Sequence, residues 1–178
     1  LTPPPPLSGD ARDLAALVAT GLPIVLANRV RTDLPVDGVS LDNVGAGEVA
    51  TRHLIEHGRS AIAYLGGQAH TATDRRRRAG FERALRAARL APFPVPYAPG
   101  AFTREHGHAA TRRLLASRRG PDGIVAADDT VALGCLDALA EAGVDVPGEV
   151  SVVGFDDIPA ASLRAVWLTT VSTAARQM

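Results

Sequence analysis

Short apolar runs alternate with helix-like stretches along almost the whole of this sequence, and no other feature limits the possible folds as much. The apolar runs are typical of strands buried on both faces, and the stretches between them carry apolar residues at helical spacing. We expect strands at residues 22–27, 38–41, 61–65, 123–127, 150–154 and 168–171. We expect helices at residues 44–57, 75–90, 104–117 and 131–142, after a short first helix near Leu14. This order predicts an α/β fold with helices on both faces of a mostly parallel sheet.

The charge balance bears on the class of partner. The 178 residues include 19 basic and 19 acidic ones, so the formal net charge is zero. A surface that binds DNA directly usually carries a basic excess, because contacts to phosphates dominate that affinity. The composition therefore disfavours direct nucleic-acid binding by this chain.

Cysteine usage and the N-terminal residues bear on the compartment. The single cysteine, Cys135, cannot form an intrachain disulfide, which fits a reducing environment. The proline-rich residues 1–9, which we expect to be extended or disordered, lack the basic start and apolar run of a signal peptide. No apolar stretch approaches the roughly 18 residues that a membrane-spanning helix needs. We therefore expect a cytoplasmic protein without membrane contact.

Polar residues follow the expected strands, at the positions where ligands bind in open parallel sheets. These positions are Asn28-Arg29, Asp42-Asn43, Gly66-Gly67, Asp128-Asp129 and Asp156-Asp157. Paired carboxylates could serve acid–base hydrolysis or hold a divalent cation. They could equally accept hydrogen bonds from neighbouring sugar hydroxyls, or cap the helix that follows. Spacing alone leaves these functions open.

Residues 45–50, Gly-Ala-Gly-Glu-Val-Ala, match the G-x-G-x-x-A pattern of dinucleotide-binding domains. That site also needs an acidic residue at the end of the next strand, where this chain has Gly66-Gly67 instead. Asn43 as a helix N-cap accounts for the local sequence without a nucleotide. We expect no nucleotide cofactor.

His53 and His57 belong to an H-x-x-E-H pattern, the inverted zinc-protease motif. Two histidines four residues apart share a helix face and could grip one metal ion. A catalytic zinc site needs a third protein ligand, which no other expected helix presents convincingly. Solvated histidines near a helix C-terminus, where positive charge is favoured, explain the pair better. We therefore expect no metal site.

Seven stretches of the chain occur in the order in which one protein family carries them: 23–29, 39–43, 50–58, 62–67, 77–81, 126–134 and 146–157, followed by 168–171. The most specific is V-P-G-E-V-S-V-V-G-F-D-D at residues 146–157. On these stretches the chain resembles the lactose-repressor/galactose-repressor family of transcription regulators. The resemblance covers most of the chain. It implies a periplasmic-binding-protein-like core, in which parallel sheets flanked by helices form two lobes.

The resemblance also implies a division of the chain. Residues 10–65 correspond to part of the N-terminal lobe, which is incomplete, and residues 66–170 correspond to the C-terminal lobe. Residues 171–178 correspond to the start of a crossover back to the first lobe. We see no counterpart in this chain of the family's helix-turn-helix head, which reads the major groove as a dimer. Operator DNA is therefore expected to be bound only through such a head.

The main site residues follow from the same resemblance. The arginine of the family's R-x-x-G-F string reaches the ligand, which points to Arg77; a salt bridge on an arginine-rich helix surface is the alternative. The first aspartate of the G-F-D-D string points to Asp156 as an acceptor for sugar hydroxyls, with helix capping as the alternative. Asp128 falls where many members carry asparagine, so a donor is lost and a charge gained. Asp129 and Asp157 then act as caps and supports.

Three further positions complete the implied ligand-binding set. Asn28-Arg29 lies where the family commonly has Asp-Arg at the end of the first strand. Thr73 precedes Arg77 by one helical turn and matches a position that lines the site. Phe102 aligns with an aromatic residue that stacks on the ligand, since an aromatic ring offers an apolar plane to a pyranose. A core phenylalanine is the alternative at this position.

The function implied by the resemblance is a regulator core that senses a sugar or a similar small polar metabolite, without enzymatic activity or cofactor. The implied assembly is a homodimer, whose contact face includes the helix after Asn43 and the helix that contains Leu133. Closure of the lobes on the ligand then biases the DNA-binding heads between two arrangements. Two alternatives stay open: a secreted sugar-binding protein of an uptake transporter, and a sugar-processing α/β enzyme built on the paired aspartates.

Overall fold

The computed structural model describes residues 10–27, 33–67, 71–95, 100–117 and 119–173. The chain divides into two units, of which the first ends at Asp42 and the second begins at Asn43. The first unit holds helix α1 (Asp10–Ala19) and two short parallel strands, β1 (Val25–Ala27) and β2 (Asp37–Val39). The second unit holds all the other elements.

A four-stranded parallel sheet forms the centre of the second unit. Its strands lie in the order β3-β4-β5-β6, which is also their order in the sequence. Their bounds are Ile62–Leu65 for β3, Gly123–Ala126 for β4, Ser151–Phe155 for β5 and Thr169–Val171 for β6. The parallel α/β organisation predicted from the alternating pattern is therefore confirmed.

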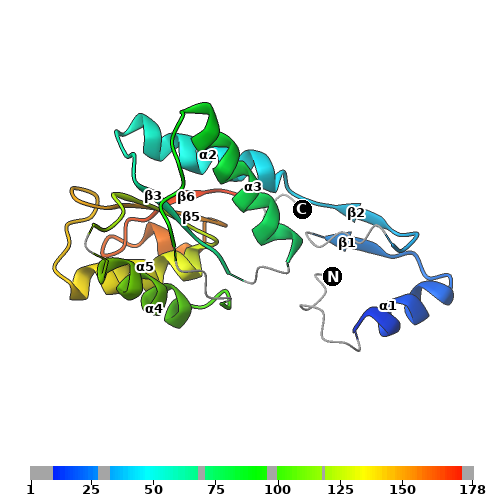
Figure 1. The fold of residues 1–178 in the computed structure, drawn as a ribbon. Coiled ribbons are helices and arrows are strands. Elements are labelled where there is room, and N and C mark those ends of the chain that lie inside the picture. The colour runs from blue at the N-terminus through cyan, green and yellow to red at the C-terminus, as the bar shows by residue number, and fades with distance from the viewer. Residues whose placement is uncertain (1–9, 28–32, 68–70, 96–99, 118, 174–178) are drawn as a thin grey trace. The chain divides into compact units, whose positions relative to one another are not determined.

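Helices cover both faces of this sheet (Figure 1). On one face lie α2 (Asn43–Glu56) and α3 (Ala72–Ala87), and on the other lie α4 (Arg104–Leu115) and α5 (Asp129–Glu141). A short 3₁₀ helix, Pro159–Ser162, lies between β5 and β6 and was not predicted.

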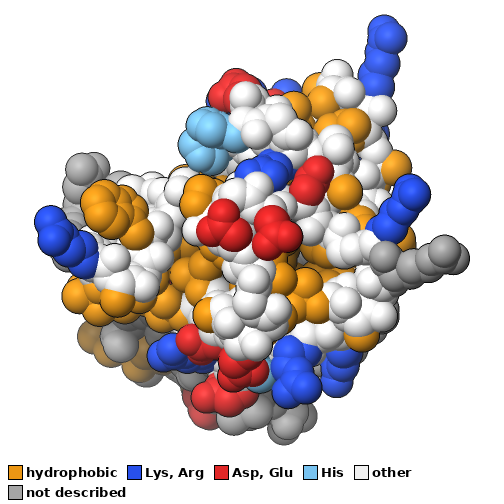
Figure 2. Space-filling model, turned by 90° about the vertical axis from the view of Figure 1, so that its left-hand side faces the viewer, with side chains coloured by type: hydrophobic (Ala, Val, Ile, Leu, Met, Phe, Trp, Pro, Cys, Tyr) orange, Lys and Arg blue, Asp and Glu red, His pale blue; other side chains and the backbone are white. Residues whose placement is uncertain are grey.

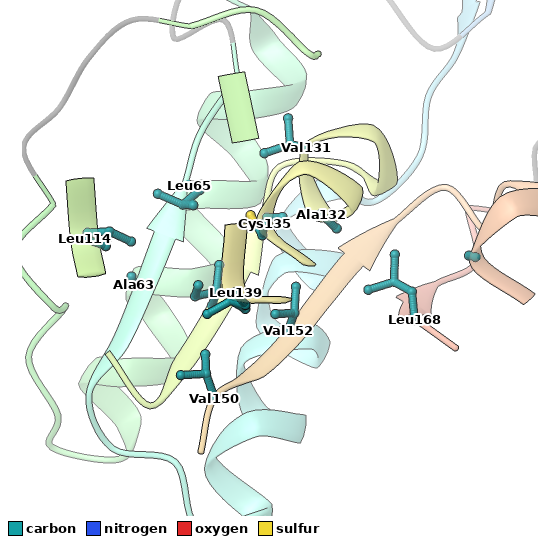
Figure 3. Close-up of a cluster of buried hydrophobic side chains, with 13 residues drawn as sticks. Ala63, Leu65, Leu114, Val131, Ala132, Cys135, Leu139, Val150, Val152 and Leu168 are labelled. Atoms are coloured by element: carbon teal, nitrogen blue, oxygen red, sulfur yellow. The ribbon is translucent and has the colours of Figure 1, made fainter. Parts of the chain in front are cut away.

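The core of the second unit consists of two apolar clusters, one on each face of the sheet. Alternate residues of each strand enter different clusters, because successive side chains of a strand point to opposite faces. Ala63 and Ile124, for example, join the cluster under α4 and α5 (Figure 3), whereas Ile62 and Val125 join the cluster under α2 and α3. Burial on both faces explains why the sequence of these strands is almost continuously apolar.

Paired glycines let α2 and α3 approach closely. A Cβ added at Gly47 would collide with the backbone carbonyl of Arg77, and one added at Gly80 would collide with the carbonyl of Val44. Gly47 belongs to the G-x-G-x-x-A motif, which lies within α2. This glycine therefore has a packing role, and its contact fixes the backbone of α3 at the position that carries Arg77.

Several observed boundaries differ from the predicted ones; strand β1, for example, begins at Val25 rather than at residue 22. Helix α3 begins at Ala72, three residues before the predicted start, because the Thr71 side chain caps it by accepting from the Asp74 amide. The two units divide at residue 42, and strand β3 pairs with β4 in the second unit. The lobe division expected at residue 65 stays a prediction. The segments 1–9 and 174–178 lie outside the described residues.

Candidate ligand-binding site

The strand register brings Asp128 and Asp156 to the same level at the carboxyl end of the sheet. Val125 of β4 pairs with Val153 of β5, and each aspartate lies three residues further along its own strand direction. Neighbouring strands are about 4.8 Å apart, so these two acidic residues follow the strands side by side. We call Arg77, Asn43, Asp128 and Asp156 the strand-mouth site.

Arg77 is hydrogen-bonded to residues on three sides of the strand-mouth site. Its Nε donates to Asn43 Oδ1 at 3.0 Å, its Nη1 to the Ala127 carbonyl at 2.6 Å, and its Nη2 to Asp156 Oδ1 at 2.7 Å. The guanidinium carbon also lies 4.5 Å from the centre of the Phe155 ring, within cation–π range. The side chain is only 2% exposed. Arg77 is thus a buried cation that links α2, α3 and the ends of β4 and β5, and the surface salt bridge considered from sequence is not what the structure shows.

Asp156, which forms this ion pair, also has a positive φ angle. Its φ angle is 98° and that of Asp157 is 52°, in a region that non-glycine residues rarely adopt. The Asp156 amide donates to the Val171 carbonyl at 3.0 Å, which holds the turn against β6. The side chain stays 38% exposed. A strained turn that presents a partly exposed carboxylate is typical of functional positions.

Asp128 is the N-cap of α5. Its Oδ1 accepts from the Val131 amide at 2.7 Å, and the side chain is half-buried. The pKa of Asp128 is raised to about 6, chiefly by burial and also by the nearby charge of Asp156, although the Val131 hydrogen bond and the Arg77 charge oppose the rise. Asp128 and Asp156 therefore lie close enough to repel each other electrostatically.

Asp129, next to Asp128, is bonded to the protein interior. The residue is fully buried; its Oδ2 accepts from the Ile158 amide at 2.9 Å and its Oδ1 from Thr170 Oγ1 at 2.6 Å. Burial raises its pKa, and both hydrogen bonds oppose the rise. This carboxylate joins the start of α5 to the segments that follow β5 and begin β6, as expected for a supporting residue.

A second buried carboxylate, Asp74, shapes the end of β3. Its Oδ1 accepts from the Tyr64 hydroxyl and from the Gly67 amide, both at 3.0 Å. Burial and then the Asp74 charge raise the pKa of Tyr64 well above its usual value, so this hydroxyl remains a donor. The network fixes the turn after β3 to the first turn of α3.

Phe102 and Thr73 lie near the same end of β3. The Phe102 ring packs so closely on Gly67 that a Cβ at position 67 would collide with it, and it also contacts the α2/α3 cluster. It is half-buried, so part of the ring is accessible. Thr73 is half-buried in the first turn of α3, one turn before Arg77. The other two predicted positions, Asn28 and Arg29, lie outside the described residues.

The sequence reasoning missed two residues of this region. Asn43 was noted at a strand end and interpreted as a helix cap, but not as a partner of Arg77; it accepts the Arg77 Nε bond and is almost fully buried. Asp74 was not singled out, although Thr71 and Asp74 have the T-x-x-D spacing of a capping pair. The capping pattern at Thr71 and Asp74 could have been recognised in the sequence. The hydrogen bond between Asn43 and Arg77 could not, because it joins residues that are 34 positions apart.

The histidine motif shows no metal geometry. The His53 and His57 rings are 4.2 Å apart between centres, and His57 Nδ1 lies 2.8 Å from the His53 carbonyl oxygen. Within the described residues, no three His, Cys, Asp or Glu side chains gather closely enough to hold a metal ion. Nor is any helix of the described part long and apolar enough to span a membrane.

A hollow of about 820 Å³ lies at the opposite end of the sheet, where β5 and β6 begin. Its lining is mostly apolar, with His53, His57 and Arg59 among the polar residues. The side of the molecule shown in Figure 2 mixes acidic, basic and hydrophobic side chains, without the single basic stripe that a nucleic acid requires. The strand-mouth site is the stronger candidate for ligand binding, because buried polar groups converge there and ligands of parallel sheets bind at that end.

Comparison with known proteins places these features in a family context. Residues 51–178 match the periplasmic binding protein-like domain family. The HTH-type transcriptional repressor PurR of Haemophilus influenzae is 36% identical over 165 residues, which cover 91% of this chain and 48% of that repressor. The chain thus spans about half the length of the curated relatives it matches.

Solved structures show the same likeness. A LacI transcriptional regulator from a Rhodococcus species matches with a TM-score of 0.84 and 33% identity, over 96% of this chain and 63% of that one. The transcription regulator CcpA of Lactococcus lactis matches with a TM-score of 0.81 and 28% identity, over 93% of this chain and 60% of that one. The periplasmic-binding-protein-like fold expected from the sequence is confirmed.

Proposed function

Because this chain belongs to the periplasmic binding protein-like domain family, we propose that it is the effector-binding core of a transcription regulator of the lactose-repressor type. The resemblance to that family is confirmed by its relatives, which are transcriptional repressors and LacI regulators. The observation that carries the proposal is the buried Arg77, which holds Asp156 at the mouths of β4 and β5. The matched relatives favour a regulator over the binding protein of an uptake transporter.

The effector in this proposal is a sugar or another small polar metabolite. Oxygens of Asp128 and Asp156 accept hydrogen bonds from its hydroxyl or amino groups, and the accessible part of the Phe102 ring covers an apolar face. Thr73 contributes at the start of α3, and Asn28 and Arg29 remain proposed ligand contacts. Arg77 acts chiefly by holding Asp156 in place, because its donors already bond three protein acceptors.

In this proposal the chain binds its effector and catalyses no reaction on it. The relatives are regulators rather than enzymes. The paired aspartates are engaged structurally: Asp128 caps α5, and Asp129 accepts two hydrogen bonds in the interior. Ligand binding then biases a regulator between two states, and ligand and operator affect each other's affinity reciprocally.

The proposed setting is the cytoplasm, and the proposed assembly is a homodimer. Helices α2 and α5 contribute to the dimer face in this proposal. Operator DNA is bound through a head domain, since the net charge of zero gives this chain no basic excess for phosphate contacts.

A thermal-shift screen of sugars and purines against the full chain tests the proposed function. A bound effector raises the melting temperature, and a tighter one raises it more at the same concentration, since it stabilises only the folded state. Asp156→Asn should abolish the shift, whereas Arg78→Ala, on an exposed face of α3, should retain it. Turnover of the bound compound, or a shift that survives Asp156→Asn unchanged, would contradict the proposal.

A further inference from the structure

We infer that the effector carries a compact positive charge, such as a protonated amine, which is held between Asp128 and Asp156. This inference rests on the proposed function, because it specifies the chemistry of the ligand for that same site. It follows from three properties of the strand-mouth site: where its one cation points, which carboxylate oxygens are engaged, and which charges surround Asp128.

The cation of the strand-mouth site is turned into the protein. Arg77 is 2% exposed and bonds Asn43, the Ala127 carbonyl and Asp156, whereas the Asp156 side chain is 38% exposed. A ligand that arrives from solvent therefore meets carboxylate oxygens before it meets the guanidinium. An anionic ligand has no exposed positive partner among the described residues of the site.

Each of the two carboxylates uses only one of its oxygens in hydrogen bonds within the protein. Asp128 Oδ1 accepts from the Val131 amide, and Asp156 Oδ1 accepts from Arg77 Nη2. Within the part of the chain that the structure describes, the Oδ2 atoms of both residues have no hydrogen-bond donor. The β4–β5 register places these two residues side by side. A single ammonium group carries three donors, enough to bond both oxygens at once.

The charges around Asp128 leave the site acidic. The negative charges of Asp156, at the end of β5, and of Asp129, at the start of α5, act on it, and among the described residues the charge of Arg77 from α3 opposes them. The raised pKa of Asp128 reports this balance together with burial. A ligand cation relieves the repulsion between the two carboxylates, whereas a neutral polyol leaves it in place.

Isothermal titration with matched probes tests the inference. The probes are D-glucamine, D-sorbitol and D-gluconate, which differ in a terminal amine, hydroxyl or carboxylate, and the pairs galactosamine/galactose and glucosamine/glucose. We expect each amine to bind the full chain at least about tenfold more tightly than its hydroxyl partner, since hydrogen bonds between charged groups are the stronger ones. Asp128→Asn should remove most of that preference while preserving the helix cap, because asparagine caps helices as well as aspartate does.

Asp137→Asn is the matched control, since Asp137 lies on the same helix and pairs with Arg104 instead. This variant should keep the amine preference. If a neutral sugar binds as tightly as its amine, or gluconate binds most tightly, the inferred charge is wrong, while Asp156-dependent sugar binding leaves the proposed function standing. If no sugar, purine or amine binds the chain at all, both are wrong.

Discussion

Replacing Asp128 by asparagine should stabilise the protein at neutral pH but not at acidic pH. The substitution keeps the shape of the side chain and the N-cap of α5, since asparagine caps as well as aspartate does. It removes a negative charge that is half-buried and faces Asp156. The stability difference between the two proteins therefore isolates the cost of ionising residue 128.

The magnitude follows from the pKa of Asp128, which is raised from 3.8 to about 6. A raised pKa means that the folded protein holds this proton more tightly than the unfolded chain does. Wild-type stability consequently falls as the pH rises from 3.8 through about 6, and the loss is complete above that range. The difference in pKa corresponds to roughly 3 kcal/mol at most, and partial exposure to solvent reduces the expected value to about 1–2 kcal/mol.

Urea unfolding followed by circular dichroism measures this effect. We expect the free energy of unfolding of Asp128→Asn, relative to wild type, to rise by about 1–2 kcal/mol between pH values near 4 and near 7.5. Asp137→Asn provides a control without this rise, because the Arg104 hydrogen bond lowers the pKa of Asp137 below its ordinary 3.8 and the group stays ionised across most of this pH range. A relative stability of Asp128→Asn that stays flat or falls with pH would refute the reasoning.

Three other substitutions test separate contacts by urea unfolding. Gly80→Ala should cost about 1–3 kcal/mol or block folding, because its Cβ meets the Val44 carbonyl; an unchanged midpoint would show that α2 and α3 are less closely packed. Asp129→Ala should cost about 2–3 kcal/mol by leaving the Ile158 amide and the Thr170 hydroxyl unpaired, and Thr170→Val in that background should then cost little. Arg77→Met should cost about 3–5 kcal/mol, since Asp156 loses its buried partner; a loss below 1 kcal/mol would contradict that role.

The strands, and the positions of the candidate site residues directly after them, could be predicted because both depend on short-range patterns. Strands buried on both faces read as apolar runs, and a parallel sheet puts its ligand-facing residues directly after those runs. Asp128 and Asp156 were found in this way, and the register then showed that they follow neighbouring strands at the same level.

The direction of the Arg77 side chain could not be predicted in the same way. Its position in the R-x-x-G-F string indicates a residue near the ligand, but not that Asn43 and the Ala127 carbonyl receive two of its donors. Those partners lie 34 and 50 positions away in the sequence. Which of them a long side chain meets depends on how α2, α3 and the sheet pack, and periodicity carries no information on that.

The two hydrogen bonds of Asp129 have a mechanical consequence. Because one carboxylate grips both the loop that leaves β5 and the first residues of β6, the turn that carries Asp156 cannot shift without pulling on the start of α5. Any displacement that a bound molecule imposes on Asp156 is therefore shared by a helix whose far end is more than three turns away. We therefore expect a displacement of Asp156 to be transmitted to helix α5 as a whole.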